Sequence, residues 1–264
     1  MTALVPRRDY LVGQRRSIIA RSIMGSLAGV VPLPFVDTWA IDRIVGGGYQ
    51  RIAASHQVDL TDEGAANLTH GTTPPPSILE LATGGIAMRI ATTAARRMML
   101  ALTTVSRARS AARTFMCMTL FDHYCAKLHT GLAIDGATAL QLRDEIVRAI
   151  EQTPGALAFH PFRRGVVSAA RATLKAPLEL ADLASRGALR RLLANNETVA
   201  EPHQIDESEQ AIEAALAEKT NFLARTVAAV EIQLSSEVNP YLDGAIEALD
   251  RRWRALLAAK ADRP

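Results

Sequence analysis

The hydrophobic and polar positions of this chain repeat with the spacing of α-helices almost from end to end. Apolar residues recur every three or four positions, and no alternating apolar stretch bounded by turn residues is long enough to predict a paired strand. The pattern predicts an all-α fold in which helical hairpins form a multi-helix bundle. The expected helices span about residues 9–31, 36–57, 78–129, 135–150, 207–234 and 240–259, with basic helices between 161 and 194.

Turn and capping residues mark the ends of several of these helices. Pro32 and Pro34 cannot donate an intrahelical hydrogen bond, so the chain must turn there after the first helix. Asp37 suits the N-cap of the second helix, and Asp135 opens the helix that follows the long third one. We expect the third helix to be interrupted once, near residues 101–106.

Gly46, Gly47 and Gly48 stand in a row inside the expected second helix. Each glycine in a helix interior costs about 1 kcal/mol relative to alanine, so some interaction should offset this cost. We expect a neighbouring helix to approach closely over this surface; the alternative is a helix break. The run is not a phosphate-binding loop, because no lysine followed by serine or threonine comes after it.

The last two expected helices both carry apolar stripes. Asn239 and Pro240 supply the N-cap and the first residue of the final helix. Its stripe consists of Leu242, Ile246, Leu249, Trp253 and Leu256. The preceding helix carries Val227, Val230 and Leu234. Because the connection between the helices is short, we expect them to pair as an antiparallel hairpin, which could also serve self-association.

Composition and charge add to this picture. Hydrophobic residues make up 48% of the chain and aromatic residues only 5%, which suits helices built from alanine and aliphatic side chains. The net charge is only +3, but residues 86–128 and 162–192 are strongly basic, whereas residues 195–250 are acidic. Either these parts neutralise each other within the molecule, or the basic part binds an anionic partner.

The sequence favours a reducing, cytosolic compartment. Cys117 and Cys125 are the only cysteines and lie in one helical run, unlike a secreted disulfide framework. Arginines precede the first apolar run without a cleavage site after it, so no signal peptide is predicted. Residues 22–36 would span about 22 Å as a helix, against roughly 30 Å of hydrocarbon, and prolines interrupt them, so no simple transmembrane helix is expected.

Candidate chemistry is sparse. Cys117, His123, Cys125 and His129 share a helical run, but helical spacing does not let them converge on one metal ion. Asp37 is better explained as a helix cap than as a catalytic carboxylate. No thioredoxin-type, serine-hydrolase or metallopeptidase motif occurs. We therefore predict a protein that is not an enzyme, with no catalytic residues, no metal and no cofactor.

Residues 17–129 resemble an uncharacterised bacterial helical domain, the YcjF-like family. The resemblance is carried by the motif Pro32, Pro34 and Asp37 in Pro-Leu-Pro-Phe-Val-Asp, and by Ile-Ala-x-x-His-x-Val-Asp-Leu at residues 52–60. The segment from 111 to 129 is similar to the last helix of that family. Its members are often fused to small GTPases or encoded beside them, so the resemblance implies membrane association and a GTPase as a partner.

These observations suggest three segments: a helical-hairpin domain over 1–134, a basic helical segment over 135–200, and an acidic helical hairpin over 201–264. The expected function is binding of the first domain to the anionic cytosolic face of the membrane, as a peripheral protein. The expected contacts are Ile18, Ile19, Ile23, Met24, Leu27, Val30, Val31, Leu33, Phe35 and Trp39, with Arg15, Arg16 and Arg21 meeting headgroups.

Two alternatives stay open at this stage. The apolar run from 18 to 36 could be bundle core, and the protein could then be a helical adaptor whose partner is another protein. Nucleic acid is not favoured as a partner, because the basic helices contain few aromatic residues and no nucleic-acid-binding signature.

Overall fold

The computed structural model describes residues 8–28, 41–72, 93–157, 162, 213, 216–217, 222–236 and 240–261. These residues are almost entirely helical, which confirms the predicted all-α class. The elements in chain order are η1 (Asp9–Leu11), α1 (Val12–Ala28), η2 (Asp42–Gly46), α3 (Gly47–Ser55), β1 (Asp59–Leu60), α4 (Asp62–His70), α6 (Thr93–Lys127), β2 (Ala133–Ile134), α7 (Gly136–Glu151), α12 (Phe222–Ser236) and α13 (Pro240–Ala261).

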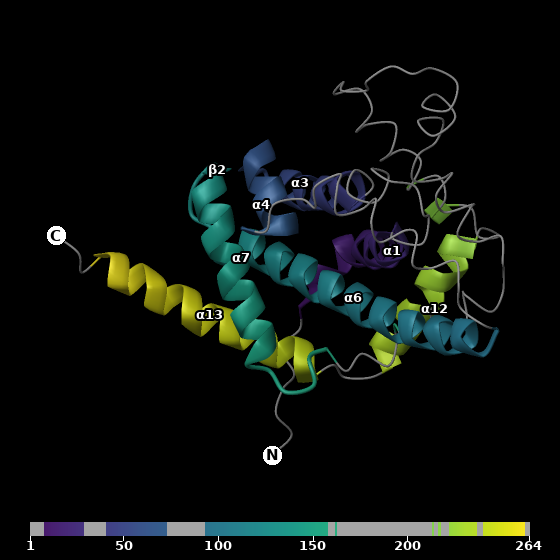
Figure 1. The fold of residues 1–264 in the computed structure, drawn as a ribbon. Helices are drawn as coiled ribbons and strands as arrows, with labels where there is room; N and C mark the ends of the chain where they lie inside the picture. The colour runs from purple at the N-terminus through teal and green to yellow at the C-terminus, as the bar shows by residue number, and fades with distance from the viewer. Residues whose placement is uncertain are drawn as a thin grey trace, which may run out of the picture.

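Helix α6 is the centre of the fold, and α1, α3, α7 and α13 all pack against it (Figure 1). The interruption that the sequence predicted near residues 101–106 is absent, since α6 is a single helix of 35 residues. Thr103, Thr104 and Val105 lower helix propensity by only a few tenths of a kcal/mol each, and no glycine or proline lies among them. This prediction was wrong because weak propensity alone does not end a helix.

Two very short strands, which the sequence pattern did not predict, tie neighbouring helix pairs together. β1 and β2 pair in parallel, with Asp59 opposite Ala133. Each strand leads into a capped helix: the hydroxyl of Thr61 accepts from the amide of Gly64, and the carboxylate of Asp135 accepts from that of Thr138. Two residues are too few to show alternation, so only the caps signal these turns.

The glycine run lies where helices meet closely. Residues 42–46 form a π-helical turn that passes without a break into α3. A Cβ atom added to Gly48 would lie 2.6 Å from the Cε of Met118 on α6 and 2.7 Å from the Cδ of Arg21 on α1. Both distances are shorter than any normal carbon contact. The expectation of close helix approach is therefore confirmed at Gly48.

The two C-terminal helices do not form the expected hairpin in the described part of the chain. α12 packs along α1, whereas α13 packs across α7 and α6, and the two helices diverge from their shared end (Figure 1). The predicted stripes are nevertheless buried, with Val227, Val230 and Leu249 fully inside the core. A periodic stripe identifies a buried face but not the helix that covers it, which explains the error.

The acidic C-terminal part supplies partners for basic residues elsewhere. Ion pairs join Arg8 to Asp243 at 2.8 Å, Arg16 to Glu231 at 3.5 Å and Arg51 to Glu213. These three arginines lie outside the basic stretches 86–128 and 162–192, so neutralisation of those stretches by the acidic part stays a prediction. One hydrophobic core cluster includes residues from all three predicted segments. The division of the chain into 1–134, 135–200 and 201–264 stays a prediction.

Candidate functional site

Two polar residues lie side by side in the apolar middle of α6. The side chain of Asp122 is 0% exposed and that of His123 is 5% exposed. Burying polar or charged groups is unfavourable unless they find hydrogen-bond partners, so each of these residues requires a specific partner from another element. The folded chain supplies those partners from both of its ends and from the residue that follows α3.

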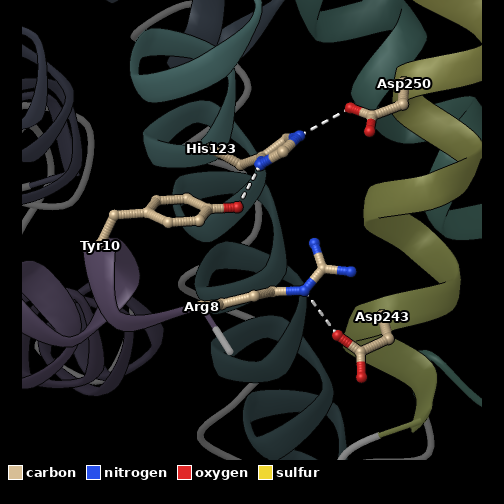
Figure 2. Close-up of polar contacts among 5 residues, drawn as sticks. All are labelled: Arg8, Tyr10, His123, Asp243 and Asp250. Carbon is tan, nitrogen blue, oxygen red and sulfur yellow. Dashed lines mark hydrogen bonds and ion pairs between the residues drawn. The ribbon is translucent and has the colours of Figure 1, made fainter. Parts of the chain in front are cut away.

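His123 bonds to two segments at once. Its Nδ1 lies 2.7 Å from the hydroxyl of Tyr10 in η1, and its Nε2 lies 2.7 Å from Oδ1 of Asp250 in α13 (Figure 2). Burial lowers the pKa of His123, and the nearby carboxylate of Asp250 opposes this shift. Burial also raises the pKa of Tyr10. Both groups are therefore neutral at pH 7.

Two further contacts strengthen this junction. Arg8 forms its ion pair with Asp243. Asp243 and Asp250 lie on the same face of α13, so this face contacts both Arg8 and His123 (Figure 2). The ammonium group of Lys127 lies 5.0 Å from the centre of the Tyr10 ring, within the range of a cation–π interaction. We call Arg8, Tyr10, His123, Asp243 and Asp250 the junction cluster.

Asp122 forms a second acid–imidazole pair next to the junction cluster. Its Oδ1 lies 2.6 Å from Nε2 of His56, which follows α3, whereas its Oδ2 has no hydrogen-bond partner among the described residues. Burial raises the pKa of Asp122, and the bond with His56 opposes this shift. A buried carboxylate with one unpaired oxygen is costly, and the raised pKa reduces that cost by favouring the protonated form.

A third buried polar group lies between α1 and η2. Arg21 is almost fully buried; its Nη1 donates to the carbonyl oxygen of Ile44 at 2.9 Å, and its Nε donates to the hydroxyl of Ser17 at 3.2 Å. The arginine therefore belongs to the packing of α1 against η2. In this fold its side chain is not exposed at the surface.

The predicted membrane contacts are placed as follows. Ile18, Ile19, Ile23 and Met24 are buried in the core, which matches the alternative that the run is bundle core. Arg15 is half-buried, Arg16 is exposed and pairs with Glu231, and Arg21 is buried. The side chains of Leu27, Val30, Val31, Leu33, Phe35 and Trp39, and the motif residues Pro32, Pro34 and Asp37, lie outside the described residues.

The cysteine and histidine run does not converge on one point. Cys117 and Cys125 are free thiols; burial raises the pKa of Cys117 to about 11 and that of Cys125 further. His123 and His129 bond to different groups, His129 through Nδ1 to the hydroxyl of Tyr124 at 3.3 Å. No group of three or more candidate metal ligands occurs within the described ranges.

The sequence did not reveal the junction cluster. From sequence spacing, His123 is a candidate only as a metal ligand, and Asp122 has no predicted role. A signal existed, because Asp122 and His123 interrupt an apolar stretch from Phe115 to Tyr124 on what becomes a central helix. Their partners lie 66 to 127 residues away in the chain, beyond the reach of local patterns.

Comparison of the chain with known proteins identifies no relative. No protein-family model matches the chain, and neither a curated protein nor a solved structure matches it. Among the described residues, no helix combines the length and the apolar character needed to span a bilayer.

Proposed function

We propose that this protein is a non-enzymatic helical adaptor that binds another protein. The observation that supports this choice is the position of Ile18, Ile19, Ile23 and Met24 in the core. These residues form the described part of the apolar run that was expected to contact lipid. Side chains that hold α1 against α6 cannot also enter a bilayer unless the bundle opens.

The arginines of α1 support the same choice. Arg21 donates to Ile44 and Ser17 within the fold, and Arg16 pairs with Glu231 of α12. Arg15 is half-buried beside the same glutamate. A headgroup site would have to compete with these internal interactions, whereas a protein partner can use the outer surface of α1 and α12 as it stands.

The outer surface of these two helices carries exposed apolar side chains. Val12 of α1 is 59% exposed and Ile232 of α12 is 68% exposed. Val12 lies one helical turn before Arg16, and Ile232 follows Glu231, the residue that pairs with Arg16. Exposed apolar side chains near charged ones are found in protein interfaces, which supports this face of α1 and α12 as the candidate contact surface. A GTPase is the partner that the YcjF-like resemblance implies.

The test is affinity capture of partners from native cytosol with matched variants. The double variant Val12→Ser, Ile232→Ser should lose a partner that the wild-type protein retains, while thermal unfolding stays unchanged because both side chains are exposed. The control is Leu257→Ser, which removes a side chain of α13 that is 45% exposed. Equal recovery of the same partner by all three proteins would contradict this surface, and recovery of no specific partner would contradict the adaptor function.

Association with the cytosolic membrane face is the second candidate function. The observation that favours it is the basic character of α6, on which Arg109 and Arg113 are exposed. No acidic residue occurs between 86 and 121, so this part of the chain suits anionic headgroups. Such binding would depend strongly on salt, because it would rest on charge and not on inserted apolar side chains.

A further inference from the structure

One histidine joins three segments that are far apart in the sequence. His123 belongs to α6, and its two ring nitrogens bond to Tyr10 in η1 and Asp250 in α13, each at 2.7 Å (Figure 2). The ring is almost completely buried. Any change in the hydrogen-bonding character of this ring therefore acts on both ends of the described chain.

The partners define which nitrogen carries the proton. An ionised carboxylate only accepts hydrogen bonds, so Nε2 of His123 must carry a hydrogen and donate it to Asp250. In a neutral imidazole, Nδ1 then has a free lone pair, and the hydroxyl of Tyr10 donates to it. The neutral ring satisfies both bonds with this one tautomer.

A second proton on the ring changes only one of the two bonds. Nδ1 becomes a donor, so this bond reverses: the hydroxyl oxygen of Tyr10 would accept from Nδ1, and the hydroxyl hydrogen would lose its acceptor beside the positive charge of Arg8. The bond to Asp250 becomes a charge-assisted bond and strengthens. Protonation thus weakens the attachment of η1 and keeps that of α13.

The charged groups around the ring act in both directions. From α13, Asp250 favours the second proton, and Asp122, the neighbouring residue on α6, favours it as well. Arg8 from the η1 side and burial of the ring both oppose it. Lys127 of α6 adds a further positive charge over the Tyr10 ring, and His56 pairs with Asp122. Burial has the largest effect of these, so the pKa of His123 lies below the ordinary value for histidine.

We propose that His123 is an acid-sensitive latch: its protonation releases η1 from α6 while α13 stays attached. Release would expose Tyr10 and Leu11, which pack against the core when the latch is closed. Val12 directly follows η1, but the latch rests on the junction cluster, so Val12→Ser and Ile232→Ser should leave its pH dependence unchanged.

Hydrogen exchange of the full chain, measured at pH 7.5 and pH 5.5, tests the latch. Amide protection factors at residues 8–12 should fall by about five- to tenfold in acid, the change expected when one hydrogen bond of a local structure is lost. Amides in the middle of α7 should keep their protection factors and serve as the internal control. Equal protection of residues 8–12 at the two pH values would overturn the proposal.

Three variants assign the effect to the proposed groups. Tyr10→Phe keeps the ring but removes the hydroxyl, so residues 8–12 should have low protection at both pH values. Asp250→Asn removes the carboxylate that favours the imidazolium, so the transition should move to lower pH. Asp122→Asn should still show the fall in protection of residues 8–12 in acid. If this variant loses that pH dependence, the proton that matters is bound by Asp122, and the latch is overturned. Tyr10→Phe with unchanged pH dependence would also overturn it.

Discussion

Trp253 connects α13 to the centre of the bundle, and its replacement tests how α13 is held. Its side chain is buried and meets the ring of Tyr124 on α6 edge to face, with ring centres 4.9 Å apart and planes at 82°. Trp253→Ala removes this contact and leaves a cavity between α13 and α6. Trp253→Phe keeps an aromatic ring and is the matched control.

The magnitude follows from burial and from the ring contact. Replacing a buried tryptophan by alanine costs about 3–5 kcal/mol of unfolding free energy, of which the aromatic pair accounts for about 0.5–1.5 kcal/mol. Phenylalanine restores much of the buried area and the ring contact, so Trp253→Phe should cost only about 1–2 kcal/mol. The alanine variant should therefore be clearly the less stable of the two.

Urea unfolding followed by circular dichroism measures this difference. The slope of unfolding free energy against urea should stay the same, so that the midpoint alone reports stability. Sedimentation should give the same molecular mass for all three proteins. If Trp253→Ala leaves the midpoint unchanged and instead abolishes self-association or partner binding, then Trp253 lies at an interface and the packing argument is wrong.

Two more predictions concern close packing and pH. Gly48→Ala should lower the unfolding free energy by about 1–2 kcal/mol, because the added Cβ collides with Met118 and Arg21. The control Gly13→Ala, whose added Cβ meets no atom within 4 Å, should raise the unfolding free energy by up to about 1 kcal/mol. Thermal or urea unfolding measures both changes, and stabilisation by both variants would refute the close packing at Gly48. The folded-state pKa of His123 is lowered, so the stability that the neutral ring contributes is lost as the pH falls below about 6.5. The pKa of Asp122 is raised, so the protein gains stability as the pH falls and that carboxyl group protonates. Asp122→Asn should therefore steepen the loss of stability in acid relative to wild type. Urea midpoints measured from about pH 7 to about pH 3.5, which covers the ordinary pKa values of both groups, test this, and a shallower loss would contradict both assignments.

Local patterns predicted the helices more reliably than their partners. The cap at Asp135 and the proline at Pro240 correctly placed the starts of α7 and α13, because these residues act within one turn of the helix end. Helix α4 was not predicted, although Thr61 caps it, since it is short and has few apolar residues. The predicted pairing of α12 with α13 was wrong because the periodicity of an apolar stripe does not indicate which other helix packs against it.

The polar junction was beyond sequence prediction for a related reason. The bond from Tyr10 to His123 spans 113 residues, and the bond from His123 to Asp250 spans 127. No spacing rule connects positions so distant, and each residue taken alone is better explained by an ordinary surface or core role. Only the packing of η1 and α13 against opposite sides of His123 brings the three groups together.

Flotation with anionic liposomes at low and at physiological salt tests the central functional proposal most directly. An adaptor whose α1 side chains belong to the core should stay at the bottom of the gradient with and without lipid, at both salt concentrations. Flotation that persists at physiological salt would mean that apolar side chains enter the bilayer. That result would contradict the adaptor proposal and would favour the membrane surface as the partner of this protein.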